Sequence, residues 1–227
     1  MSTLAIVGAG PGLGFSIARR FGAEGFDVGL VSRSQQRLDE LAGQLQAEGI
    51  HAAGFAADVT DPGTVTSALD RIESRLGAID VLEYSPAARL GTPDLAPVDA
   101  IHVTVENLRP QVEYYLYGGV SAIGHVLPAM IERGSGTILV TTGASSGPAI
   151  HPPFANIAAG SGALRNWVLN LHQALTGTGV YAAHIAIAVW IGAGAPEAEP
   201  DVIAERYWEL YRTRETPELF YQALPAK

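Results

Sequence analysis

The fold of this chain is decided by the stretch from Leu4 to Gly14, which reads LAIVGAGPGLG. Its first four residues are apolar and predict a short buried strand that runs directly into glycines. Apolar residues then recur at helical spacing from Leu13 to Phe21, so we expect a helix to begin near Gly12. Backbone N–H groups at a helix start have no partner inside the helix and carry partial positive charge. A strand, a glycine turn and a helix N-terminus together predict a cradle for phosphate.

The spacing of the glycines is more informative than their number. The common dinucleotide fingerprint, Gly-x-Gly-x-x-Gly, fails because Leu13 holds its last place, whereas Gly8-x-x-x-Gly12-x-Gly14 fits the sequence. That spacing resembles the short-chain dehydrogenase/reductase family, in which it binds NAD or NADP. We therefore expect Gly8, Gly12, Leu13 and Gly14 to contact a dinucleotide cofactor. The alternative is a tight turn in an α/β domain without a ligand.

The end of the second expected strand, residues 26–31, bears on the choice of cofactor. An acidic residue there would bind the ribose 2′-hydroxyl and disfavour a 2′-phosphate, and Asp27 lies at the wrong end of the strand. Ser32 and Arg33 instead offer a hydroxyl and a guanidinium, which suit a phosphate. This favours NADP over NAD. The alternative is that Arg33 is merely solvated, while Ser34 caps the next helix.

A third strand is expected over residues 52–57, followed by Asp58 and Val59. In the short-chain dehydrogenase family an Asp-Val pair at this place contacts the adenine ring, so the resemblance assigns both residues to the cofactor. Asp58 is alternatively a plain turn residue. Asp61 and Pro62 then open another helix, as an N-cap followed by proline at the first helical position.

The remaining pattern predicts an α/β fold. Further strands are expected at 79–82, 137–142 and 182–189, with a last short strand at 219–221. A proline-rich loop, 86–97, precedes a helical stretch from 103 to 132 that Pro110 and the pair Gly118-Gly119 should interrupt. Helices are also expected at 155–175 and 201–212. We predict one Rossmann-like, doubly wound parallel sheet flanked by helices on both faces, with residues 1–227 as a single domain.

Composition excludes several classes of protein. The 227 residues contain no cysteine, so disulfides and thiolate chemistry are excluded, and a cytoplasmic location is expected. We expect no membrane span and no signal peptide, because no run of about 18 apolar residues occurs. The net charge of −9 argues against a nucleic-acid partner.

The resemblance also says where catalytic residues should lie. In the family a tyrosine handles the substrate proton, a lysine four residues later lowers its pKa, and a serine and an asparagine support them. A phenol of ordinary pKa near 10 needs such a cation to ionise near neutrality. The four positions hold Asn156, Gly160, Gly143 and Tyr115 respectively. No tyrosine or lysine occurs between residues 145 and 165, and the single lysine of the chain is Lys227.

Three residues are candidate substitutes. Ser145 follows the fifth strand and has a hydroxyl that would bond a carbonyl, or else it simply forms a turn. His151 offers an imidazole that exchanges protons near neutral pH, although His-Pro-Pro is equally a rigid bend. Tyr115 brings a phenol to the same region, where it donates a hydrogen bond or packs in the core. No metal site is expected.

Three functions remain open on the sequence alone. The resemblance implies an NADP(H)-dependent oxidoreductase that acts on a carbonyl or alcohol substrate, here without the usual Tyr-x-x-x-Lys proton donor. The second function is a catalytically silent NADP(H)-binding sensor or regulatory subunit, and the third is a structural partner. The family resemblance further implies a homo-oligomer, a dimer or tetramer packed through the long helix.

Overall fold

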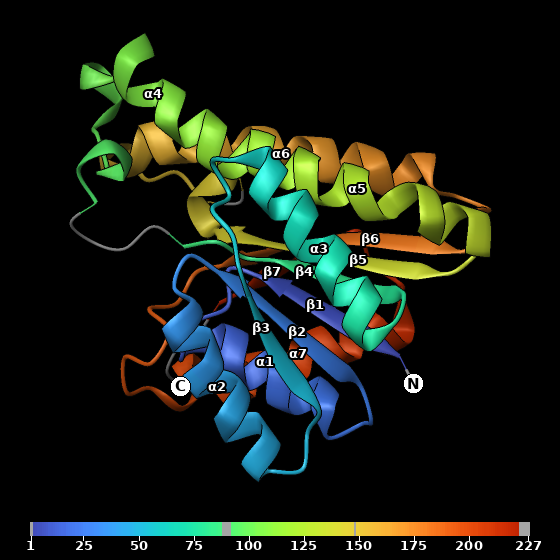
Figure 1. Cartoon of the computed structure of the whole chain (residues 1–227). Coiled ribbons are helices and arrows are strands. Elements are labelled where there is room, and N and C mark those ends of the chain that lie inside the picture. Colours follow the sequence, from blue (N-terminus) through green and yellow to red (C-terminus); the bar gives the residue numbers. More distant parts are fainter. Residues whose placement is uncertain (1, 88–91, 148, 223–227) are drawn as a thin grey trace.

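The computed structural model describes residues 2–87, 92–147 and 149–222. Its centre is a parallel sheet in the order β3-β2-β1-β4-β5-β6-β7 (Figure 1). The strands are β1 (Thr3–Val7), β2 (Asp27–Ser32), β3 (Ala52–Ala56), β4 (Ile79–Tyr84), β5 (Gly136–Gly143), β6 (Val180–Ile187) and β7 (Glu218–Tyr221). The predicted doubly wound α/β fold is confirmed, including its short last strand.

Helices cover both faces of the sheet (Figure 1). They are α1 (Leu13–Gly22), α2 (Gln35–Ala47), α3 (Pro62–Leu76), α4 (Val105–Gln111), α5 (Gly118–Arg133), α6 (Ala155–Ala174) and α7 (Pro200–Thr213). The apolar sides of α1, α2 and α7 form one hydrophobic core against the sheet, and those of α3, α5 and α6 form the other. None of the helices in the described ranges is long and apolar enough to cross a bilayer.

The predicted helix starts are confirmed at two caps. The Ser34 hydroxyl accepts a hydrogen bond from the backbone N–H of Arg37, which caps α2. The Asp61 carboxylate accepts from the backbone N–H of Gly63, and Pro62 occupies the first position of α3. Both caps satisfy N–H groups that a helix leaves without an internal partner. They fix where the chain turns from strand into helix beside the carboxyl ends of β2 and β3.

The expected interruption of the long helical stretch takes the form of a π-helix. Residues Val112–Tyr117 form this π-helix between α4 and α5, and it begins two residues after Pro110. An extra residue per turn rotates the side chains that follow, and such segments occur often at functional sites. The prediction of a break was right. Its type was not predicted, and it decides which tyrosine faces the candidate site.

The largest boundary error concerns the sixth strand. The sequence predicts it at 182–189, whereas β6 runs from Val180 to Ile187. The strand begins earlier than the apolar run indicates because the preceding turn ends at Gly179, which has a positive φ of 81°. Part of the loop 86–97, namely 88–91, and Lys227 lie outside the described residues.

Candidate nucleotide-binding site

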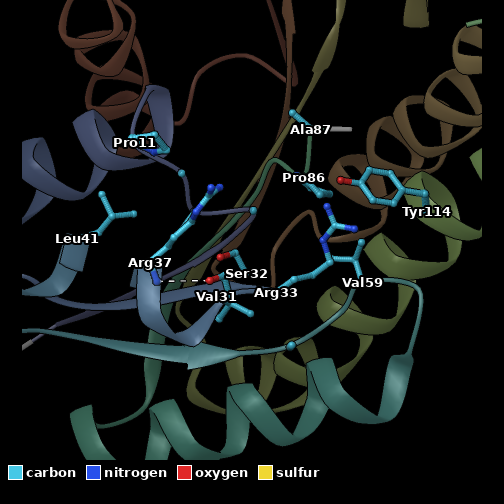
Figure 2. Close-up of a pocket in the computed structure, with 15 residues that line it drawn as sticks. Pro11, Val31, Ser32, Arg33, Arg37, Leu41, Val59, Pro86, Ala87 and Tyr114 are labelled. Carbon is cyan, nitrogen blue, oxygen red and sulfur yellow. Dashed lines mark hydrogen bonds between the residues drawn. The ribbon is translucent and has the colours of Figure 1, made fainter. Parts of the chain in front are cut away.

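A cavity of about 520 Å³ lies at the carboxyl ends of β1, β2, β3 and β4, beside the glycine-rich turn (Figure 2). This is the edge of a doubly wound sheet where ligands bind. The residues that line the cavity come from the turn after β1, the ends of β2, β3 and β4, helix α2 and the π-helix. They are Gly8, Ala9, Gly10, Pro11, Val31, Ser32, Arg33, Ser34, Arg37, Leu41, Ala57, Val59, Pro86, Ala87 and Tyr114.

The glycine turn forms the floor of this cavity. Gly8 has a φ of 110°, and a Cβ atom there would lie 2.5 Å from the backbone nitrogen of Pro86, so only glycine fits. A Cβ on Gly14 would stand 3.2 Å from the Cα of Ala9, which lets α1 pack closely against the turn. A Cβ on Gly10 or Gly12 would meet nothing within 4 Å, so open space lies over this backbone. The turn therefore presents open backbone to the cavity, which is what close approach of a phosphate requires.

Two arginines supply positive charge to the cavity. Figure 2 shows the guanidinium of Arg33 extending toward Tyr114 and that of Arg37 toward Pro11. No carboxylate of the described residues forms a salt bridge with either group, and Ser32 adds a hydroxyl beside them. Arg37 was not predicted from the sequence. The signal was its place in the first turn of α2, next to the end of β2.

Tyr114, also missed, closes the side of the cavity that faces Arg33. Its ring packs edge-on against Tyr115 with the centroids 5.1 Å apart, and its carbonyl accepts a hydrogen bond from the Tyr84 hydroxyl. Burial raises the pKa of Tyr114 far more than the nearby Arg33 guanidinium lowers it. The phenol therefore stays protonated and serves as a hydrogen-bond donor at the cavity wall.

The residues assigned to the adenine ring behave differently from each other. Val59 lines the cavity. The Asp58 carboxylate is engaged in a local turn, where it accepts from the backbone N–H of Thr60 at 3.0 Å and from its hydroxyl at 2.8 Å. Four residues that the sequence assigns to the cofactor lie next to the lining residues and are not among them: Gly12, Leu13, Gly14 and Asp58. Leu13 is buried in the core under the turn.

Asn156, at the position that the resemblance gives to the tyrosine, ties a loop to the start of α6. The residue is fully buried. Its side-chain oxygen accepts from the backbone N–H of Val98 at 2.8 Å, and its amide donates to the carbonyl of Ala96 at 2.9 Å. These bonds use both ends of the amide, so Asn156 acts here as a structural tie.

Gly160, one helical turn later at the position of the lysine, lies against the end of α4. A Cβ atom on Gly160 would stand 2.8 Å from the carbonyl oxygen of Gln111. Gln111 is itself fully buried, and neither polar atom of its side chain has a partner among the described residues. The close approach of α4 to α6 leaves no room for a long side chain at this position.

The three candidate substitutes do not form one cluster. Tyr115 packs on the core between Tyr114 and α6, and burial raises its pKa to about 12, so it remains protonated. Ser145 lies half-buried in the turn Ala144–Ser146 directly after β5. His151 is exposed and rests on the ring of Phe154, with the ring centroids 5.0 Å apart. Gly143 is exposed at the end of β5.

A chain of buried polar groups, not foreseen from the sequence, lies beneath that turn. The Thr142 hydroxyl donates to the Ser146 hydroxyl at 2.8 Å, and its oxygen lies 2.8 Å from Nε2 of His184. Nδ1 of His184 faces the Glu218 carboxylate at 3.0 Å, and Arg165 pairs with that same carboxylate. Burial lowers the pKa of His184 to about 4, more than the carboxylate raises it. His184 is therefore neutral at physiological pH, with its proton on Nδ1, where it donates to the Glu218 carboxylate.

No three histidine, aspartate or glutamate side chains in the described part of the chain gather as a metal site would require. The organisation of the cavity is that of an organic ligand site: an apolar wall, a glycine turn and two guanidinium groups.

Comparison with known proteins agrees with this geometry. Sulfoacetaldehyde reductase 2 of Chromohalobacter salexigens is 30% identical over 182 residues, which cover 80% of this chain and 69% of the reductase. Serine 3-dehydrogenase of Agrobacterium fabrum is 33% identical over 181 residues, or 78% of this chain and 68% of that enzyme. The structure of L-sorbose reductase from Gluconobacter frateurii, complexed with NADPH and L-sorbose, superposes with a TM-score of 0.81 at 21% identity, covering 96% and 94% of the two chains. The short chain dehydrogenase family model matches residues 2–191, and the chain belongs to that family.

Proposed function

We propose that this chain binds NADP(H) in the cavity between the glycine turn and Arg33. The observation that carries the proposal is the pair of guanidinium groups, Arg33 and Arg37, that lines the same cavity as the glycine turn. A 2′-phosphate is the group of NADP that NAD lacks, and guanidinium groups bind it with charge-assisted hydrogen bonds. The solved reductase that superposes on this chain was complexed with NADPH, which supports the same choice.

In this proposal Gly8, Gly12, Leu13 and Gly14 hold the pyrophosphate, Ser32 and Arg33 hold the 2′-phosphate, and Asp58 and Val59 border the adenine. Gly10 and Gly12 present backbone to open space, which supports the first assignment. When bound, the nicotinamide supplies or accepts a hydride. Arg37 and Tyr114 join these residues as lining groups of the same cavity.

We further propose an oxidoreductase that acts on a carbonyl or alcohol substrate without the Tyr-x-x-x-Lys donor. Asn156 and Gly160 support the absence of that donor, because Asn156 is bonded to two backbone groups and Gly160 is packed on Gln111. The proton then comes from another group, and the candidates are Tyr115, Ser145 and His151. Losing a positioned acid–base residue costs on the order of 10²–10⁴-fold in rate, so slow turnover is expected.

The test has two stages. NADPH and NADH are titrated by fluorescence, and NADPH should bind more tightly by at least roughly tenfold. Aldehydes, ketones and quinones are then screened for oxidation of NADPH, with Tyr115→Phe, Ser145→Ala and His151→Gln as variants. Turnover that one variant abolishes identifies the donor, and failure of both nucleotides to bind overturns the proposal.

The second candidate function is a catalytically silent NADP(H) sensor, and Asn156 favours it specifically. Its side chain ties residues 96 and 98 to α6, so it serves as a structural link and supplies no proton donor at that position. NADPH binding without turnover across the whole panel would select the sensor. Binding of NADPH that leaves the rate of amide hydrogen exchange in residues 92–104 unchanged would count against it.

We also propose that the chain forms a homo-oligomer through the long helical stretch. Tyr117 is 57% exposed, and Val120 and Ile131 are each at least 40% exposed on the outer side of the π-helix and α5. Exposed apolar side chains along a helix are suited to an interface between two copies. Sedimentation should give a dimer or tetramer that Val120→Glu dissociates.

A further inference from the structure

Glu83 is a buried carboxylate that is not part of the site described so far. It is the last residue but one of β4, three residues before Pro86 of the cavity wall. It is fully buried in β4, and its neighbour across the ladder in β1 is Ile6. Desolvation raises the pKa of Glu83 to about 7, despite hydrogen bonds that lower it. A buried acid that titrates near neutral pH is unusual and needs a physical reason.

The groups around Glu83 are hydroxyls and not cations. The hydroxyl of Ser85, directly after β4, donates to one carboxylate oxygen at 2.7 Å. The hydroxyl of Thr141, in β5, donates to the other at 2.9 Å. Tyr207, from α7, lies 2.7 Å from the Thr141 hydroxyl. Since Thr141 gives its hydrogen to Glu83, Tyr207 donates to Thr141. No arginine or histidine of the described residues is bonded to the carboxylate, so its charge is balanced only by hydroxyl dipoles.

Ser85 connects this carboxylate to the floor of the cavity. Its backbone N–H donates to the carbonyl of Val7 at 2.8 Å, immediately before Gly8. A Cβ on Gly8 would lie 2.6 Å from the carbonyl carbon of Ser85 and 2.5 Å from the nitrogen of Pro86. Gly8 and Pro86 both line the cavity. Glu83 therefore stands one hydroxyl away from the backbone against which the nucleotide phosphates would lie.

We propose that Glu83 takes up a proton when the phosphates of the cofactor bind at the glycine turn, so that this buried residue makes cofactor affinity depend on pH. The inference rests on the proposed NADP(H) site. The phosphates bring negative charge close to a carboxylate that no cation compensates, and the interaction is strong because the surroundings are poorly hydrated. Protonated Glu83 donates to Ser85 or Thr141 in place of accepting, and the released hydroxyl hydrogen turns away from the carboxyl group.

The sign of the effect follows from linkage. A group whose pKa is higher in the complex than in the free protein takes up a proton on binding. Binding therefore weakens as the pH rises between the two pKa values. With the free value at about 7, affinity for NADPH should fall above pH 7 by up to about tenfold per pH unit. Glu83 acts here as a positioning residue and touches no ligand atom.

The experiment measures NADPH affinity from pH 6 to pH 9 for the wild type, Glu83→Gln and the control Glu132→Gln. Glutamine has the shape of glutamate and no charge, whereas Glu132 is an exposed carboxylate in the last turn of α5, at the opposite edge of the sheet. The titration of the NADPH 2′-phosphate itself is common to all three proteins. Calorimetry in buffers of different ionisation enthalpy counts the protons taken up.

Glu83→Gln should remove most of the fall in affinity above pH 7 and the accompanying proton uptake, while Glu132→Gln should match the wild type. Equal pH slopes in all three proteins would overturn the inference while leaving the NADP(H) site intact. Absence of NADPH binding at every pH would overturn both. Should Glu83→Gln fail to fold, carbon NMR of the wild-type Glu83 carboxyl decides the matter, because its pKa must rise when NADPH is added.

Discussion

Gly160 lies directly against Gln111, so that a Cβ atom on the glycine would stand 2.8 Å from the carbonyl oxygen of the glutamine. A lysine at this position must push α4 away from α6. A tyrosine in place of Asn156 must also give up the bonds to Ala96 and Val98. The contact therefore opposes the introduction of a tyrosine–lysine pair at these two positions.

The double variant Asn156→Tyr/Gly160→Lys should accordingly lose about 3 kcal/mol or more in free energy of unfolding, from overpacking and from two unpaired backbone groups. Chemical denaturation measures this loss. Gly43→Lys is the matched control, because a Cβ on Gly43 in α2 meets nothing within 4 Å. A double variant as stable as the wild type that reduces carbonyls with NADPH would contradict the packing argument.

The two cavity arginines should set the preference for NADPH. Arg33→Ala and Arg37→Ala should each weaken NADPH binding by roughly 10- to 100-fold, the worth of a charge-assisted hydrogen bond, and change NADH binding little. Fluorescence titration gives both affinities. Arg75→Ala, an exposed arginine in the last turn of α3, should leave them unaltered. Equal losses for NADPH and NADH would place the guanidinium groups away from the 2′-phosphate.

The positive φ of Gly8 should make it the least replaceable residue of the turn. Gly8→Ala places a Cβ within 2.5 Å of Pro86, at a φ of 110° that disfavours alanine, so both folding and NADPH binding should suffer. We expect a loss of roughly 2 kcal/mol or more in unfolding free energy. Gly43→Ala, at an open helical position, should instead stabilise the protein by about 0.5–1 kcal/mol. A Gly8→Ala protein with wild-type NADPH affinity would show that the turn does not contact the cofactor.

The neutral state of His184 predicts acid sensitivity. Its pKa falls from an ordinary 6.5 to about 4 in the folded protein, so its contribution to stability is present above pH 6.5 and is lost as the pH falls toward 4. That loss amounts to about 3 kcal/mol. Glu218, whose pKa the Arg165 guanidinium lowers, loses its contribution over a still more acidic range.

Urea denaturation of the wild type between pH 7 and pH 4 should show this fall, and His184→Gln should show a smaller one. His102→Gln removes an exposed imidazole and serves as the control. An unchanged pH dependence in His184→Gln would mean that other groups cause the acid loss.

The sequence predicted the parts of the protein that depend on local patterning. The strand before Gly8, the cap at Ser34 and the Asp61-Pro62 helix start follow from residue types at fixed spacing, and all three are confirmed. The kinked helix was predictable from Pro110 and Gly118, because both disturb an α-helix. Its conversion into a π-helix was not, since that depends on how α4 packs against α6.

The missed residues are those whose role comes from the tertiary structure. Arg37 and Tyr114 carry no motif, and they line the cavity only because α2 and the π-helix converge on it. His184 and Glu83 sit inside apolar runs, where a single polar letter gives no hint of its partners. Those partners, Glu218 and Thr141, lie 34 and 58 residues away along the chain.

The direction in which the sheet is wound reverses between β1 and β4, and the cavity straddles that reversal. Apart from Tyr114, the cavity walls come from the chain up to residue 87, whereas Asn156, Gly160 and Gly143 belong to the half built by β5 and α6. In the proposed function, cofactor binding and proton transfer lie in separately supported halves of one molecule. A substitution in the half built by β5 and α6 should therefore leave the packing of the glycine turn against Pro86 unchanged.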